Sequence, residues 1–151
     1  MSIQIVKEVF DPWQAIQDYQ HTYLPAGQYG ASNIFIGTLR DFNDGESVKG
    51  MTLEYYPGMT EKQLQKIVDA ANEQWSILDC LVIHRVGDIF PNESIVLVAV
   101  WSAHRGDAFD ACRYIMEALK SNAPFWKKEL LASDEQRWLA ANTDGYTKKD
   151  S

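Results

Sequence analysis

Basic side chains stand at the ends of several expected strands and helices. In chain order these are Arg40, His104-Arg105, Lys120 and Lys127-Lys128, the last followed by Glu129. The ends of secondary-structure elements are where a scaffold presents side chains to a pocket. If these ends converge, they form a cationic site, and Phe125 and Trp126 offer aromatic walls. The natural ligand of such a site is a small anion, such as a phosphate carried on a planar group.

Each of these groups also has a purely structural explanation. A lysine at a helix C-terminus, such as Lys120, is favoured by the helix dipole alone. Lys127-Lys128 also fits a solvated charge pair, and Arg40 fits a surface ion pair with a nearby aspartate. His104-Arg105 also fits the start of a loop, because a buried strand must return to solvent. Spacing alone therefore leaves both explanations open for every group.

The elements that must position these residues are interspersed strands and helices. We expect strands near 3–9, 31–40, 48–56, 78–86 and 94–102, and helices near 12–24, 60–75 and 107–120. Asp11-Pro12 combines an N-cap residue with a proline at the first helical position. Thr60 to Gln63 has the spacing of a capping box. Asp44-Gly45 between two strands favours a hairpin.

Two apolar runs and one helical stripe define the expected core. The runs 78–86 and 94–102 lack alternation, so both faces of these strands are expected to be covered. The helix near 107–120 has an inner stripe of Phe109, Cys112, Ile115, Met116 and Leu119. With at least two hairpins, this pattern predicts an α+β domain with a mixed or antiparallel sheet. We expect one domain over 1–140 and a polar tail over 141–151.

Composition excludes several classes of function. The chain has 151 residues and a net charge of -7, so a general nucleic-acid-binding protein, which needs a basic face, is not expected. The longest apolar run, 95–101, is far too short to cross a bilayer. The two cysteines, Cys80 and Cys112, form no CxxC pair, and no cluster of metal-binding residues stands out. No signal peptide is expected, and a reduced cytoplasmic setting is the default.

The order of the motifs resembles one family. Gly30-Ala31, Phe35-Ile36-Gly37 and Arg40 are followed by Leu53 to Met59, Ile83-His84-Arg85-Val86-Gly87, Ser102-Ala103-His104-Arg105, Ala108-Phe109, Lys120 and Pro124 to Glu129. This series, which covers most of the chain, is similar to the molybdopterin synthase catalytic (large) subunit family. Each block is weak alone, but five blocks in order with suitable gaps are specific.

The resemblance implies a fold, a reaction and partners. The fold would be an α/β hammerhead with a small β subdomain. The reaction would convert cyclic pyranopterin monophosphate to molybdopterin by inserting two sulfur atoms, with no cofactor expected. The sulfur would arrive as a thiocarboxylate on the C-terminal glycine of a small ubiquitin-like carrier subunit. The large subunits would form a homodimer within a heterotetramer.

The resemblance also implies roles for individual residues. Lys120 would be the general acid/base or a transient covalent partner of the carrier's acyl group, and Lys127 would bind the substrate and stabilise negative charge. The remaining residues expected to bind or support the substrate are Arg40, His104, Arg105 and Lys128, with Phe35 and Met116 lining a pterin slot or packing in the core. Glu129 would orient a lysine. In the family, the His-Arg pair is thought to reach into the pocket of the neighbouring protomer.

The chain departs from the family pattern at two places and leaves two rival functions open. Pro91-Asn92-Glu93 replaces a Gly-Glu pair, which asparagine tolerates because it adopts left-handed turns. Asn142 stands near a position where some relatives have an arginine. One rival is a phosphoester hydrolase acting on a small cyclic phosphate, which would need a metal or a positioned water. The other is a non-catalytic relative that only binds the carrier.

Overall fold

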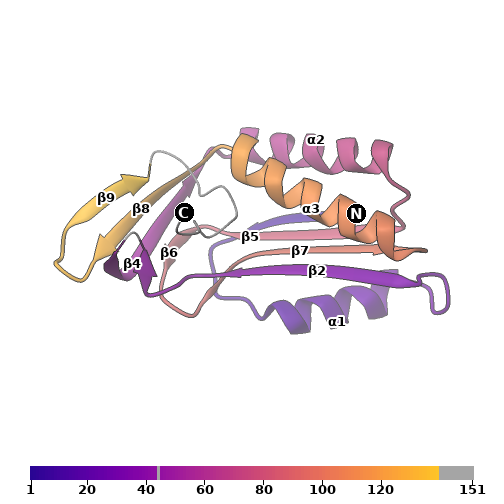
Figure 1. Ribbon diagram of the computed structural model, residues 1–151, viewed down its shortest axis with the longest axis horizontal. Coiled ribbons are helices and arrows are strands. Elements are labelled where there is room, and N and C mark those ends of the chain that lie inside the picture. Colours follow the sequence, from indigo (N-terminus) through magenta and orange to yellow (C-terminus); the bar gives the residue numbers. More distant parts are fainter. Residues whose placement is uncertain (44, 140–151) are drawn as a thin grey trace, which may run out of the picture.

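Two β-sheets and three α-helices make up residues 1–43 and 45–139, which are the residues that this computed structural model describes (Figure 1). The helices are α1 (Pro12–Tyr23), α2 (Met59–Gln74) and α3 (Arg105–Asn122). The strands are β1 (Ser2–Val6), β2 (Ala31–Thr38), β3 (Phe42–Asn43), β4 (Glu46–Tyr55), β5 (Asp79–Arg85), β6 (Gly87–Ile89), β7 (Ser94–Ser102), β8 (Phe125–Leu131) and β9 (Gln136–Leu139). The predicted α+β class is confirmed.

The larger sheet has four strands in the order β1-β5-β7-β2. β1 runs parallel to β5, and the other two pairs are antiparallel. Helices α2 and α3 cover one face, and α1 covers the other (Figure 1). The central strands β5 and β7 are therefore buried on both sides, as their unbroken apolar sequences predict.

The smaller sheet has five strands, with β3, β4, β8 and β9 in order and β6 paired to β4. It forms the small β subdomain at the end of the larger sheet where α3 finishes (Figure 1). The strands β8 and β6 are not among the strands expected from the sequence. Alternating charged residues hide the pattern of β8, and β6 has only three residues.

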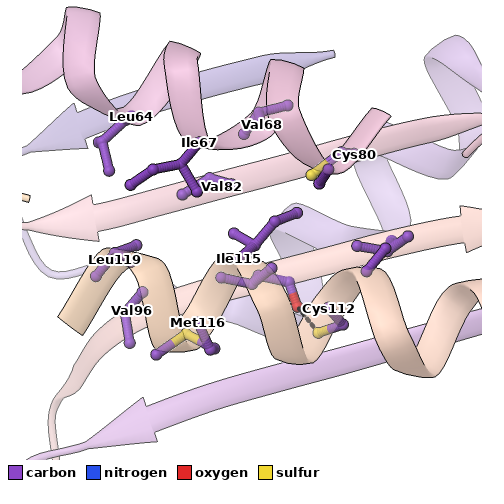
Figure 2. Packing of buried hydrophobic residues seen from close by; sticks show 14 residues of the cluster. Leu64, Ile67, Val68, Cys80, Val82, Val96, Cys112, Ile115, Met116 and Leu119 are labelled. Carbon is purple, nitrogen blue, oxygen red and sulfur yellow. Dashed lines mark hydrogen bonds between the residues drawn. The ribbon is translucent and has the colours of Figure 1, made fainter. Parts of the chain in front are cut away.

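The core beneath α2 and α3 is built from alternate residues of the central strands. Cys80 and Val82 of β5 and Val96 of β7 lie under the helices (Figure 2). From α3, Cys112, Ile115, Met116 and Leu119 point down onto them. The prediction for Phe109 is wrong, because its side chain is 59% exposed. Helical spacing placed it near the stripe, but the buried face of α3 is narrower there.

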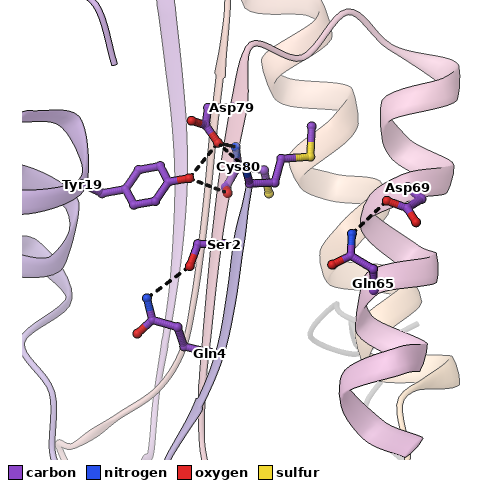
Figure 3. A network of polar contacts seen from close by, with 8 residues as sticks. Ser2, Gln4, Tyr19, Gln65, Asp69, Asp79 and Cys80 are labelled. Carbon is purple, nitrogen blue, oxygen red and sulfur yellow. Dashed lines mark hydrogen bonds and ion pairs between the residues drawn. The ribbon is translucent and has the colours of Figure 1, made fainter. Parts of the chain in front are cut away.

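The helix α1 is fixed at its start and along its buried side. The Asp11 carboxylate accepts hydrogen bonds from the backbone N–H groups of Trp13 and Gln14, so the predicted N-cap is confirmed. On the sheet side, the Tyr19 hydroxyl donates to Asp79 at 2.7 Å (Figure 3). Its ring stacks on Trp101, with 5.5 Å between the ring centroids. This contact holds α1 against β5 and β7.

The capping interaction of α2 lies two residues before the predicted one. The helix begins at Met59, and the Glu61 carboxylate accepts a hydrogen bond from the backbone N–H of Gly58. Thr60 is fully buried instead of capping the helix. Its hydroxyl accepts from the Tyr56 N–H and donates to the Pro124 carbonyl, so it ties the start of α2 to the start of β8.

Two turns depend on their particular residues. Gly30 lies so close to the Ala103 carbonyl that a Cβ atom would overlap it, which explains the glycine just before β2. Asn92 has a φ of 73°, so it adopts the left-handed turn expected of it. The predicted hairpin near Asp44-Gly45 is formed by β3 and β4, and not by β2 and β4, because β2 pairs with β7.

None of the helices in residues 1–43 and 45–139 is long and apolar enough to span a membrane.

Candidate functional site

Lys120 and Lys127 come together where α3 ends and β8 begins. Lys120 lies in the last turn of α3, and Lys127 is the third residue of β8. The two side chains share a hydrogen bond. A lysine ammonium group only donates, so one member of such a pair must be neutral. Burial, followed by the charge and hydrogen bond of Lys120, lowers the pKa of Lys127 to about 7.

The buried face of β8 explains why Lys127 is desolvated. Successive strand residues point to opposite faces, so Lys127 and Glu129 share a face with Leu131. Lys127 and Glu129 lie beside Leu53 and Met51 of β4, which are both buried. A charged amine on this face loses hydration, which favours its neutral form.

Glu129 is the acidic group of this face and is only 3% exposed. Its carboxylate accepts a hydrogen bond from Nε of Arg137 on β9 at 2.9 Å. Its charge raises the pKa of Lys127, against the larger effects of burial and Lys120. The sequence interpretation assigned Glu129 to orienting a lysine and did not expect its ion pair with Arg137.

Lys128 points to the opposite face of β8. Its amine lies over the ring of Trp138, 5.1 Å from the ring centroid, and its backbone pairs with the same residue. Such a contact between a cation and an aromatic face is weakly stabilising at an exposed site. The strand therefore separates two adjacent lysines that the sequence interpretation had grouped into one site.

His84 also lies at this end of the sheet, and the sequence interpretation gave it no role. It is 1% exposed, and its ring stacks on Phe125 with 4.1 Å between centroids. Burial is the main cause that lowers its pKa to about 3, and the charges of Lys120 and Lys127 act in the same direction. The available signal was a polar residue inside an otherwise apolar strand.

Arg40 follows β2 at the same end of the larger sheet as the lysine pair. Thr38, the last residue of β2, pairs with Ser94 at the start of β7. Leu119, next to Lys120, packs near Val96 of the same strand (Figure 2). Arg40 itself is exposed. The structure thus brings Arg40, Lys120 and Lys127 to one end of the molecule.

His104 and Arg105 lie at the opposite end of α3. Lys120 comes fifteen residues after Arg105 in one continuous helix, so the two are separated by roughly 22 Å at 1.5 Å per residue. Both His104 and Arg105 are exposed. Within one chain, the predicted convergence of all the basic groups therefore does not occur.

The remaining predicted residues lie between these ends. Phe35 is near the middle of β2 and is 41% exposed, whereas Met116 is buried in the core beneath α3. Asn142 lies outside the described residues.

Both cysteines are buried, and burial raises the pKa of Cys80 to about 12 and that of Cys112 to about 11. Neither thiol is thus suited to act as a nucleophile at neutral pH.

A separate cavity of about 650 Å³ lies at the C-terminal end of α1. Its walls include Gln20, His21, Tyr23 and Tyr29. Because α1 covers the other face of the sheet from α3 (Figure 1), this cavity is not part of the lysine site.

Comparison with known proteins identifies the family. The sequence model of the MoaE protein family matches residues 5–122. A molybdopterin synthase catalytic subunit from Ralstonia nicotianae is 60% identical over 76% of this chain, and the match spans 64% of that protein, just under two thirds of its length. One from Pseudomonas aeruginosa is 46% identical over 92% of this chain and 90% of that protein. The chain therefore belongs to the MoaE protein family.

Solved structures agree with this assignment. A MoaE protein from Burkholderia ambifaria superimposes with a TM-score of 0.77 at 41% identity, covering 95% of this chain and 92% of that one. A molybdopterin synthase from Staphylococcus aureus gives a TM-score of 0.79 at 34% identity, covering 90% and 95%. The predicted fold family is confirmed.

Proposed function

We propose that this chain is the catalytic subunit of molybdopterin synthase, a sulfurtransferase that converts cyclic pyranopterin monophosphate to molybdopterin. The observation that supports this most directly is the hydrogen-bonded pair of Lys120 and Lys127, with a Lys127 pKa of about 7. Both cysteines of the chain are buried. The sulfur must then come from elsewhere, namely the thiocarboxylate on the C-terminal glycine of a small ubiquitin-like carrier subunit.

The lysine pair provides the chemistry that such a reaction needs. A neutral amine at pH 7 accepts a proton, and its protonated form donates one to a leaving oxygen. A neutral amine also attacks an acyl group. We assign Lys120, which shares a hydrogen bond with Lys127, two possible roles: general acid/base or transient covalent partner of the carrier's acyl group. Lys127, when protonated, stabilises negative charge that develops on the substrate. Arg40 at the same end is an exposed donor for the substrate phosphate.

A second copy of the chain would complete the anion site. His104 and Arg105 are too far from Lys120 to act on the same bound substrate in one chain. β2 is an edge strand of the larger sheet, and Phe35 is exposed near its centre. A two-fold axis near this point would bring the start of one α3 towards the end of the other, because such an interface pairs the same surface on both copies. The homodimer would bind one carrier subunit at each end, giving a heterotetramer.

Phe35 and Met116 are proposed to line the pterin slot. Phe35 offers an exposed aromatic face near the middle of β2, and Met116 lies on the stripe of α3 one turn before Lys120. Lys128 binds the substrate only if the substrate or carrier also contacts the outer face of β8. We assign the protein to the cytoplasm, where two unpaired cysteines remain reduced.

The rival functions are less well supported. A metal-dependent phosphoester hydrolase needs clustered ligands, and residues 1–43 and 45–139 contain no group of three or more His, Cys, Asp or Glu side chains placed to hold a metal ion. A non-catalytic carrier-binding relative has no need for a desolvated lysine pair, and keeping one costs stability.

Reconstitution tests the proposed function. The purified chain is mixed with a thiocarboxylated carrier and cyclic pyranopterin monophosphate, and molybdopterin is assayed. We expect product formation that depends on the thiocarboxylate and is insensitive to zinc or magnesium chelators. A folded sample that binds the carrier but forms no product would contradict the proposal, and inhibition by chelators would favour the hydrolase.

A further inference from the structure

His84 occupies a position where packing alone would place an aliphatic residue. Alternate residues of β5 face α2 and α3, and the first two, Cys80 and Val82, belong to the apolar core. His84 continues this row, beside Val96 of β7 in the strand register. It is 1% exposed. Burying a polar ring in such a row costs free energy unless its polar atoms are used.

The protonation of the His84 ring is determined by its neighbours. Nδ1 lies 2.9 Å from the backbone carbonyl oxygen of Arg85. A carbonyl only accepts hydrogen bonds, so Nδ1 carries the proton and Nε2 has a lone pair. Arg85 is itself fixed, because its guanidinium pairs with Glu93 at 2.9 Å and donates to the Asp88 carbonyl. With its pKa lowered to about 3, the ring is neutral at pH 7.

The ring is joined to the lysine pair through Phe125. The two rings stack with 4.1 Å between their centroids and 19° between their planes. Phe125 and Lys127 are two residues apart on β8 and therefore project from the same face. The charges of both Lys120 and Lys127 act on His84.

We propose that His84 is a positioning residue. Its neutral ring, fixed by Arg85 and stacked on Phe125, forms a water-excluding surface beside Lys120 and Lys127 that keeps Lys127 desolvated. The inference deepens the proposed function, since it concerns the same lysines. The charged groups that act on Lys127 are Lys120 from α3 and Glu129 from β8, and Glu129 is paired with Arg137 from β9. His84 contributes from β5 without adding a charge. A carboxylate in its place would favour the ammonium form of Lys127.

Two substitutions distinguish a role of His84 in desolvating Lys127 from a role in core packing alone. His84→Asn keeps an N–H near the position of Nδ1 for the Arg85 carbonyl, but it removes the ring and admits water. His84→Phe keeps a flat, dry ring for Phe125 and loses the hydrogen bond. We expect His84→Asn to raise the pKa of Lys127 by about one unit, a tenfold drop in the neutral fraction at low pH. His84→Phe should leave this pKa near that of the wild type.

The measurement does not depend on turnover. The folded protein is labelled with trace acetic anhydride across a pH series, and mass spectrometry gives the reactivity of Lys127 relative to Lys66, which is exposed on α2. An unchanged Lys127 pKa in His84→Asn, or an equal rise in His84→Phe, would overturn the proposal. If His84→Asn does not fold, Phe125→Leu replaces it and should raise the pKa in the same direction; no rise would again overturn the proposal. Failure of the reconstitution assay would leave these results unaffected, so the two proposals fail separately.

Discussion

The two ends of α3 present basic residues in opposite physical settings. At its start, His104 and Arg105 are exposed. At its end, Lys120 shares a hydrogen bond with Lys127, whose pKa is lowered mainly by burial. An exposed arginine binds anions but cannot give up its proton, whereas a desolvated lysine can. The proposed function therefore assigns anion binding to one end of the helix and proton transfer or acyl chemistry to the other.

Removing the amine at the buried end should have the largest effect. Lys120→Ala should lower kcat by about 10² to 10⁴-fold, the range typical of a general acid or base. Binding of the carrier subunit, measured by calorimetry, should be unchanged. Lys66→Ala on the exposed side of α2 is the matched control. Turnover of Lys120→Ala near the wild-type level would remove the distinction between the two ends.

Mixed dimers test whether the exposed end acts on a second copy. Lys120→Ala and Arg105→Ala chains with different tags are co-expressed, and the dimer containing one of each is purified. In that dimer one site has both side chains intact, so about half of the wild-type activity should return for a two-fold interface. If Arg105 acts within its own chain, both sites are defective and activity stays at the level of the single variants.

The pKa of Lys127 predicts a pH-dependent stability. Its value is about 7 in the folded protein and 10.5 ordinarily. Between these values the unfolded chain binds a proton that the folded chain does not, so this group makes stability rise with pH over that window. Lys127→Met should flatten the rise while abolishing activity. Urea unfolding at pH 7 and pH 9 measures the slope, and an unaltered slope would mean that Lys127 is not desolvated.

The smallest effect is expected on the outer face of β8. Lys128→Ala removes the contact with Trp138. The free energy of unfolding of this variant should be about 0.5–1 kcal/mol lower than that of the wild type. Turnover should change little, because Lys128 projects from the face of β8 opposite to Lys127. A loss of turnover comparable to that of Lys127→Met would show that the substrate or carrier reaches this face.

Local signals predicted the elements better than the site. Asp11 capped its helix as expected because the hydrogen bonds join neighbours in sequence. The strand β8 was missed because Lys127 and Glu129 alternate with Lys128, which made a half-buried strand resemble a solvated charged loop. Glu129 is buried against Arg137, which lies eight residues away on the next strand, and Lys127 is buried beside Lys120, whose charge lowers the pKa of Lys127. The spacing of residues in the sequence does not predict these side-chain contacts.

The distance between the two basic ends also depended on geometry that motif order does not contain. The motifs that contain Arg105 and Lys120 follow one another closely in the sequence pattern, yet nearly the whole length of α3 lies between the two residues. In the sequence His84 stands out only as part of a motif, because its proposed role depends on stacking with Phe125 from another sheet. Fold class follows from apolar patterns, whereas a site follows from which ends the fold brings together.

The burial of Cys80 and Cys112 has a practical consequence for following the sulfur. Their thiols are inaccessible and have raised pKa values, so mild alkylating reagents should leave this chain unmodified while it is folded. Under the proposed function, the sulfur nucleophile open to iodoacetamide in a reaction mixture would then be the one that a carrier brings. Alkylation of the quenched mixture should therefore count the sulfur atoms delivered without interference from the thiols of this chain.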